Sequence, residues 1–277
     1  MSELVTLPPK GRLPQRDIGK IPVLEAHHLG IDFGGLTAVD EFELLIGKTE
    51  IDGLIGPNGA GKTTVFNLLT KVYQPTRGTI LLNGKDTAGM DTAGINRVGI
   101  ARTFQNIRLF GNQSVEDNVK IGLHNHMKTG LFSDIFRLPS FWKEEKKAHE
   151  TAMELLSIFD MQHLADHEAG SLPYGAQRRL EIVRALATSP SLLLLDEPAA
   201  GMNPSETAEL MENIRKIRDT FQIAILLIEH DMNLVMNICE GIVVLNYGRI
   251  IAKGTPEEIQ SDPTVIEAYL GKKKEGE

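Results

Sequence analysis

The sequence is poor in cysteine and has no excess of positive charge. Cys239 is the only cysteine among 277 residues, so the chain can form no disulfide within itself and no metal site from several thiolates. Such cysteine usage is typical of a reducing cytosol. Asp and Glu number 37 against 29 for Lys and Arg, which gives a net charge of −8. Because nucleic-acid binding relies on cations that neutralise phosphates, we expect no nucleic acid among the partners.

Long hydrophobic runs are also missing. The longest, 192–195 and 223–228, fall far short of the roughly 20 apolar residues that a membrane-spanning helix needs, so we expect no such helix. Residues 1–22 contain an early Glu3 and four prolines, in place of the basic start and apolar stretch of a secretory signal. We therefore interpret residues 1–22 as a flexible extension. Hydrophobic residues make up 42% and charged residues 24%, which is ordinary for a folded globular protein.

Strand and helix patterns alternate along the rest of the chain. Apolar or alternating segments typical of strands occupy 23–28, 39–46, 51–55, 79–82, 100–104, 192–195, 223–228, 242–245 and 249–252. Helical patterns occupy 61–71 and begin again near residues 114, 143, 204 and 231. Strands that alternate with helices imply an α/β fold, with a mostly parallel sheet covered on both faces. Residues 107–185 are helical in pattern, which indicates an inserted helical region.

A glycine-rich motif follows the predicted strand 51–55 directly. It matches the phosphate-loop pattern in its expected context between a strand and a helix. Glycines let the main chain wrap closely around phosphates, so that N–H groups and the positive end of the helix point at anionic oxygens. We expect Lys62 to reach the β and γ phosphates of ATP and the Thr63 hydroxyl to bind Mg²⁺. The predicted ATP-binding residues here are Gly56, Pro57, Asn58, Gly59, Ala60, Gly61, Lys62, Thr63 and Thr64.

Two acidic residues end the apolar run 192–195. The C-terminal edge of a buried parallel strand is where ligands bind in open α/β sheets, so Asp196 is expected to bind the metal. Glu197 lies one residue further and is expected to act as general base toward a water molecule at the γ-phosphate. Alone, such a pair would also suit a helix N-terminus. The phosphate loop in the same chain favours the catalytic interpretation.

The remaining motifs resemble those of ATP-binding cassette (ABC) ATPases in order and spacing from about residue 23 to 270. The segment 172–179, Leu-Pro-Tyr-Gly-Ala-Gln-Arg-Arg, resembles their signature, and Gln105 resembles their Q-loop glutamine. His230 resembles their switch histidine, and Phe33, with Val39 nearby, occupies the place where the family stacks an aromatic ring on adenine. Taken singly, the histidine and the glutamine would read as solvated surface residues and Phe33 could be core.

This resemblance implies a role for each matching residue. Catalysis would involve Glu197, His230, Lys62 and Gln105, with Mg²⁺ held by Thr63, Gln105 and Asp196, and adenine contacted by Phe33 and Val39. The signature would contact the nucleotide of a partner subunit through Leu172, Pro173, Tyr174, Gly175, Ala176 and Gln177.

The resemblance also implies an organisation for the chain. A P-loop (RecA-like) core with an N-terminal antiparallel β subdomain would comprise 23–106 and 186–255. An α-helical subdomain carrying the signature would occupy 107–185, and C-terminal helices with a tail would occupy 256–277. Residues 23–277 would thus form one ABC-type ATP-binding domain.

Several longer segments resemble one branch of the family, the LivG-type ATP-binding subunits of branched-chain amino acid importers. These segments are FGGLTAVD, RTFQNIRLF, DEPAAGMNP, LLIEHDMNLVM and the Tyr-Gly pair of the signature. The resemblance implies a peripheral ATPase on the cytoplasmic face of the inner membrane. Its partners would be two transmembrane permease subunits, a second ATP-binding subunit in a head-to-tail dimer, expected to be a paralogue, and indirectly a solute-binding protein.

Other functions stay open on the sequence alone. The same cassette could serve urea transport or lipopolysaccharide export, because the solute contacts other chains. A soluble cassette ATPase acting on nucleic acid or as an assembly scaffold is a further alternative, although the single cassette and the negative charge count against it. We also expect Ile107, Leu109 and Phe110 to line the groove that receives a helix of the membrane subunits, with the core as the alternative location.

The signature departs from the family pattern, with Pro173 in place of Ser and Tyr174 in place of Gly. Proline has neither a hydroxyl nor an N–H, so it cannot donate a hydrogen bond to the partner's γ-phosphate. If the partner is a paralogous ATPase with an intact Ser signature, we hypothesise that the ATP site covered by Pro173 turns over more slowly than the site built on this chain's own phosphate loop. A second departure is Asn203 in place of Asp in the D-loop, which keeps a hydrogen-bonding side chain but loses its charge.

Overall fold

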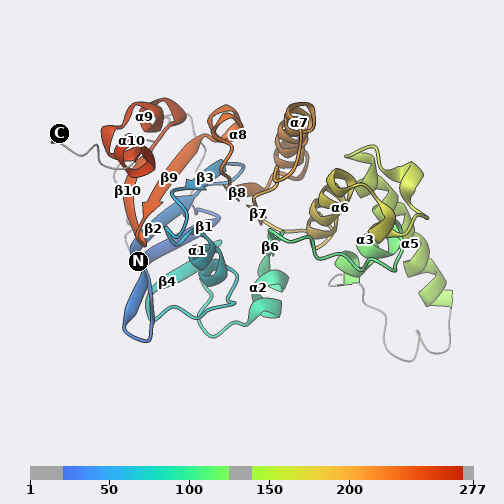
Figure 1. Cartoon of the computed structure of the whole chain (residues 1–277). Coiled ribbons are helices and arrows are strands. Elements are labelled where there is room, and N and C mark those ends of the chain that lie inside the picture. Colours follow the sequence, from blue (N-terminus) through green and yellow to red (C-terminus); the bar gives the residue numbers. More distant parts are fainter. Residues whose placement is uncertain (1–20, 125–138, 271–277) are drawn as a thin grey trace.

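The computed structural model describes residues 21–124 and 139–270 and contains two sheets (Figure 1). The smaller sheet has the strand order β2-β1-β4-β5 and is antiparallel throughout. Its strands are β1 (Leu24–Phe33), β2 (Leu36–Ile46), β4 (Arg77–Leu82) and β5 (Lys85–Asp86). It is the antiparallel β subdomain that the sequence predicts.

The larger sheet has the strand order β10-β9-β3-β8-β7-β6. Its strands are β3 (Ile51–Ile55), β6 (Ile100–Arg102), β7 (Leu192–Asp196), β8 (Ala224–Ile228), β9 (Gly241–Asn246) and β10 (Arg249–Gly254). Neighbouring strands are parallel except for the β9–β10 hairpin. The prediction of a mostly parallel sheet is confirmed.

The register of this sheet aligns the ends of its central strands. Ile228 at the end of β8 is opposite Leu54 of β3 on one side and Asp196 of β7 on the other. The segments that follow β3, β7 and β8 therefore leave the sheet at the same edge.

Helices cover the sheet and form a separate group at one end of the molecule (Figure 1). They are α1 (Lys62–Leu69), α2 (Thr92–Val98), α3 (Val115–Leu123), α5 (Pro139–Ser157), α6 (Tyr174–Leu186), α7 (Pro204–Phe221), α8 (Met232–Ile238), α9 (Pro256–Ser261) and α10 (Pro263–Leu270). Two short 3₁₀ turns, η2 (Gln162–Leu164) and η3 (Ala169–Ser171), precede α6. The end group consists of α3, α5 and α6, and it corresponds to the predicted helical region. None of the helices in the described ranges is both long and apolar enough to span a bilayer.

The core has two parts, one on each face of the larger sheet. Along β7, Leu193 and Leu195 pack into the part that includes α6, α7 and α8, while Leu192 and Leu194 pack into the part that includes α1 and the antiparallel sheet. Each buried leucine removes apolar surface from water, worth about 25 cal/mol per Å². This is why β7 reads as an unbroken apolar run in the sequence.

Some predicted segments lie largely or wholly outside the described residues. They are residues 1–20 of the predicted extension and residues 271–277 of the predicted C-terminal tail. The domain boundaries given above stay predictions.

Asn203, which replaces the usual Asp of the D-loop, is the N-cap of α7, a role that the sequence did not indicate. Its side-chain oxygen accepts the backbone N–H groups of Ser205 (2.9 Å) and Glu206 (3.0 Å), and the Glu206 carboxylate accepts the N–H of Asn203 (2.9 Å). This is a capping box with Pro204 in the first turn of α7.

We therefore predict that Asn203→Ala lowers the free energy of unfolding by about 1 kcal/mol, because two N–H groups at the start of α7 lose their acceptor. Urea denaturation of the full chain measures this value. Asn203→Ser serves as the control, since serine is also a good N-cap and should retain most of the stability. Equal losses for both variants would contradict a capping role.

Candidate functional site

The predicted catalytic side chains meet at the carboxyl edge of the larger sheet. The phosphate loop follows β3, and Gln105 follows β6. Asp196 is the last residue of β7 and Glu197 comes directly after it, while His230 follows β8. This edge is where ligands bind in open α/β sheets.

Glycines give the phosphate loop its shape. Gly56, Gly59 and Gly61 have φ angles of 151°, 79° and 104°, a region that suits glycine. The loop is closed by a hydrogen bond from the Ala60 N–H to the Pro57 carbonyl (3.1 Å). Asn58 and Gly59 are exposed at its tip.

The start of α1 is suited to an anion. Gly61 is its N-cap and supplies no side-chain hydrogen bond, and its first turn contains no acidic residue. The first N–H groups of a helix have no partner within the helix and carry its positive dipole end. Thr63 is exposed and Thr64 half-buried in this turn. The residues present therefore fit a triphosphate, as predicted.

Lys62 lies inside the loop. Its ammonium donates to the carbonyls of Gly56 (2.7 Å) and Pro57 (3.0 Å). Burial lowers the pKa of Lys62, while the charges of Glu197 and Asp196 act to raise it. The lysine is thus close to both carboxylates that the sequence assigns to catalysis.

Glu197 is held from two sides by the other predicted catalytic residues. The Gln105 amide donates to its Oε2 (2.9 Å), and His230 Nε2 lies 2.7 Å from its Oε1. Its main chain is left-handed, with φ of 48°, and its N–H donates to the carbonyl of Ile228 (2.9 Å). Positive φ at a non-glycine residue is uncommon and clusters at functional sites. Both carboxylate oxygens therefore have a fixed orientation.

Asp196 has a partner that the sequence did not indicate. It forms an ion pair with Arg102 (2.7 Å), and both side chains are buried. Arg102 also donates to Asn67 Oδ1 (2.7 Å). Among the described residues there is no group of three or more His, Cys, Asp or Glu side chains that could hold a metal. The predicted Mg²⁺ ligands thus form no cage from protein carboxylates, which accords with the usual way Mg²⁺ is bound, by one or two carboxylates together with substrate phosphates.

Glu229 is a second residue that sequence reasoning missed. Its buried carboxylate accepts the N–H groups of Ala199 (2.7 Å), His230 (2.9 Å) and Asp231 (3.3 Å). Burial raises the pKa of Glu229, and these N–H groups act in the opposite direction. Glu229 thereby ties the loop after β7 to the loop that carries His230.

The two predicted adenine contacts differ in exposure. Phe33 is 43% exposed and its ring lies edge-on to Tyr73, with centroids 5.2 Å apart, so it is available for stacking. Val39 has no exposed surface and packs in the core, so the structure does not favour its predicted contact with a base, which stays a prediction. The resemblance gave its position, but burial depends on the β1–β2 packing.

The signature lies at the start of α6. Pro173 is the N-cap and provides no side-chain hydrogen bond. Tyr174 is 47% exposed, and its ring would be 3.3 Å from a Cβ placed on Gly201 of the DEPAAGMNP segment. Leu172 and Ala176 are buried, Gly175 is half-buried, and the Gln177 amide donates to the Leu172 carbonyl (2.8 Å).

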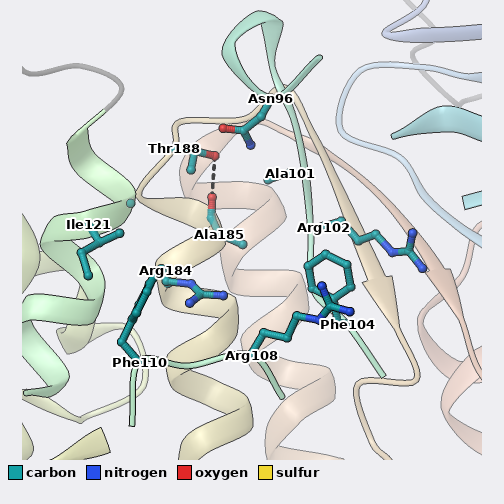
Figure 2. Close-up of a pocket in the computed structure, with 11 residues that line it drawn as sticks. Asn96, Ala101, Arg102, Phe104, Arg108, Phe110, Ile121, Arg184, Ala185 and Thr188 are labelled. Carbon is teal, nitrogen blue, oxygen red and sulfur yellow. Dashed lines mark hydrogen bonds between the residues drawn. The ribbon is translucent and has the colours of Figure 1, made fainter. Parts of the chain in front are cut away.

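A cavity of about 430 Å³ lies between the helical group and β6 (Figure 2). Two aromatic rings in it form cation–π contacts with arginines. The Arg108 guanidinium lies 4.3 Å from the Phe104 ring centroid, and the Arg184 guanidinium lies 5.8 Å from the Phe110 ring centroid. The full lining is Asn96, Ala101, Arg102, Phe104, Arg108, Phe110, Ile121, Gly122, Arg184, Ala185 and Thr188.

The predicted docking role of Ile107, Leu109 and Phe110 stays a prediction, and the three residues differ in where they lie. Phe110 lines this cavity, but Ile107 and Leu109 do not, and Leu109 packs against the core.

Comparison with known proteins agrees with this geometry. The profile of the ABC transporter family matches residues 39–200. The chain belongs to the ABC transporter family. A second profile, described as branched-chain amino acid ATP-binding cassette transporter, matches residues 249–275 of this ABC protein.

Two bacterial relatives are similar over 90% of the chain and 98% of their own length. The branched-chain amino acid transport ATP-binding protein BraF of Pseudomonas aeruginosa is 47% identical over 250 residues. The corresponding protein LivG of Escherichia coli is 49% identical over 250 residues. Among solved structures, the ADP conformation of MJ1267, an ATP-binding cassette of an ABC transporter, is 30% identical with a TM-score of 0.78. That match covers 90% of this chain and 99% of MJ1267. The predicted fold and family are confirmed.

The loop geometry leads to a prediction about two glycines. A Cβ on Gly56 would overlap the Leu245 carbonyl oxygen, whereas a Cβ on Gly59 would meet nothing within 4 Å. Both positions carry positive φ, which costs roughly 1–3 kcal/mol for other residues. Gly56→Ala should therefore abolish measurable ATP binding, while Gly59→Ala should weaken it by about tenfold.

Equilibrium ATP titration of the purified full chain measures both affinities, and thermal melting confirms that each variant is folded. Equal losses at the two positions would show that backbone conformation alone matters and that contact with Leu245 does not.

Proposed function

We propose that the chain is the ATP-hydrolysing subunit of an importer of branched-chain amino acids. The observation that carries the hydrolysis is Glu197 oriented by Gln105 and His230 beside the phosphate loop. Support for the solute class comes from BraF and LivG, the branched-chain amino acid transport proteins to which the chain is 47% and 49% identical.

Different residues of the chain bind the phosphates, the magnesium ion and the adenine ring. The free N–H groups of the loop and of the first turn of α1, together with Lys62, bind the β and γ phosphates. Thr63, Gln105 and Asp196 would hold a magnesium ion, which when bound supplies charge that stabilises the phosphate oxygens. Phe33 stacks on the adenine ring.

Glu197 acts on the attacking water. As general base it accepts a proton, and its two neighbours fix the direction of its lone pairs. His230 lies on the opposite side of the carboxylate from Gln105 and contacts the γ-phosphate. Catalysis is then mainly positioning and charge stabilisation.

The proposed assembly places a second ATP-binding subunit head to tail on this chain, together with two permease subunits, one of which inserts a helix into the cavity of Figure 2. A solute-binding protein lies beyond the permease subunits. The chain would lie on the cytoplasmic face of the inner membrane. In this dimer the start of α6 faces the partner's nucleotide. Pro173 has no hydroxyl to donate to that phosphate, but backbone N–H groups at the start of α6 can still contact it.

We predict that Glu197→Gln lowers ATP turnover by at least about 10²-fold while ATP still binds, because the amide cannot accept the proton. Phosphate release and ATP titration on the same preparation measure the two quantities. Glu212→Gln is the matched control, since Glu212 is an exposed residue of α7 paired with Arg215. If Glu197→Gln retains wild-type turnover, the proposed role of Glu197 is wrong.

The same variant tests the asymmetry between the two ATP sites. In the assembled transporter, Glu197→Gln here should reduce transport more than the equivalent change in the partner, because the partner's site is covered by Pro173. An equal or smaller loss contradicts the asymmetry.

The cavity of Figure 2 also leads to a prediction. Its rings provide apolar contact and its arginines provide positive charge, which suits a short helix with a carboxylate near its tip. Phe110→Ser should weaken binding of the permease subunits by about tenfold or more, since exposed aromatic anchors dominate interface energies.

Co-purification and affinity measurements with the permease subunits test this, and ATP titration should be unchanged. Ile266→Ser is the control, because Ile266 is a similarly exposed apolar residue on α10. Equal weakening by the two substitutions would show that the cavity is not the docking site.

A further inference from the structure

The segment that carries Gln105 has no regular secondary structure. Between β6 and α3, residues 103–110 form neither strand nor helix, so their peptide groups need partners from elsewhere. The N–H of Thr103 finds its partner on β7, where the Leu194 carbonyl accepts it (2.9 Å). The groups on both sides of the glutamine are bound by two side chains of α6.

Arg178 and Glu181 provide these contacts. Both are almost completely buried, at 0% and 1% exposure. Arg178 donates to the carbonyls of Phe104 and of Gln105, the latter at 2.7 Å. Glu181 Oε1 accepts the N–H groups of Phe104 (3.4 Å) and Arg108 (3.2 Å). The two side chains are joined to each other at 3.3 Å, so they form one unit, the Arg178–Glu181 clamp.

The choice of residues indicates a geometric role. A buried ion pair is costly to desolvate, and apolar side chains of similar volume often give equal or greater stability. Arginine, however, presents a planar fork that can bind two carbonyls and a carboxylate at once in a fixed orientation. Such a fork sets the position of the Gln105 main chain in a way that apolar packing does not.

The clamp also touches the start of α6. Arg178 Nη2, which donates to the Gln105 carbonyl, also donates to the Tyr174 hydroxyl (3.0 Å). Tyr174 is the first residue of α6, directly after Pro173. A single guanidinium therefore contacts both the signature and the residue whose amide donates to Glu197.

We propose that Arg178, together with Glu181, is a positioning residue that holds the Gln105 amide against Glu197 and links this contact to the start of α6. A displacement of the first turn of α6 by a partner subunit then moves the Gln105 backbone through one buried group. This inference rests on the proposed ATP hydrolysis and goes beyond it.

The test is a double-mutant cycle in the assembled transporter with Arg178→Lys and Gln105→Ala. Lysine keeps the charge but lacks the fork, so kcat for ATP should fall by up to about 10²-fold while KM changes little, since the clamp does not contact nucleotide. If Arg178 acts through Gln105, the substitution should have no further effect on kcat in the Gln105→Ala background.

Arg215→Lys is the control. Arg215 is a partly exposed arginine of α7 that is paired with Glu212, and its kcat should stay within about twofold of wild type. Equal factors for Arg178→Lys in both backgrounds, or no loss of kcat in either, overturn the inference. A rise in KM with kcat unchanged also overturns it.

Thermal melting shows whether each variant is folded. If Arg178→Lys gives no cooperative transition, Glu181→Gln replaces it under the same criteria, because its neutral amide cannot form an ion pair with the guanidinium. Wild-type transporter that binds but does not hydrolyse ATP refutes the proposed function instead, and this outcome is read before any variant is compared.

Discussion

The register of β3, β8 and β7, which aligns the carboxyl ends of these three strands, is the constraint on which the site depends. Ile228 pairs with Leu54 on one side and Asp196 on the other, so three loops leave the sheet at the same height. A slip of one residue in either pairing would reverse which side chains enter the two core parts, and burial on both faces opposes this. The distances of Glu197 to its neighbours are therefore a consequence of hydrophobic packing below the site.

Much of the site could be read from the sequence because its signals are local. The strand 51–55, the glycines after it and the acidic pair after β7 each define their own conformation within a few residues. Arg102, Arg178, Glu181 and Glu229 could not be found in this way. Each acts on backbone or side chains far along the chain, as Arg178 does on a segment more than 70 residues earlier. Nothing in the local pattern distinguishes such a residue from a solvated one.

Val39 and Leu109 show a second limit of prediction from the sequence, which concerns the direction in which a side chain points. Both occupy positions where a resemblance or a short apolar run favoured a contact with a ligand or partner. Val39 is buried in the core, and the half-buried Leu109 packs against it. Apolar side chains in an irregular segment can face either way, and the direction depends on elements distant in sequence. Buried polar side chains then fix the loops that the strands leave free: the carboxylate of Glu229 holds one, and the Arg178–Glu181 clamp another.

The uncapped first turn of α1 has a consequence for the life of the protein in a cell. A helix end whose N–H groups are completed by a diffusible anion gains stability by mass action, in proportion to the logarithm of the anion's concentration above its Kd. Resistance to proteolysis would then rise with the concentration of bound nucleotide.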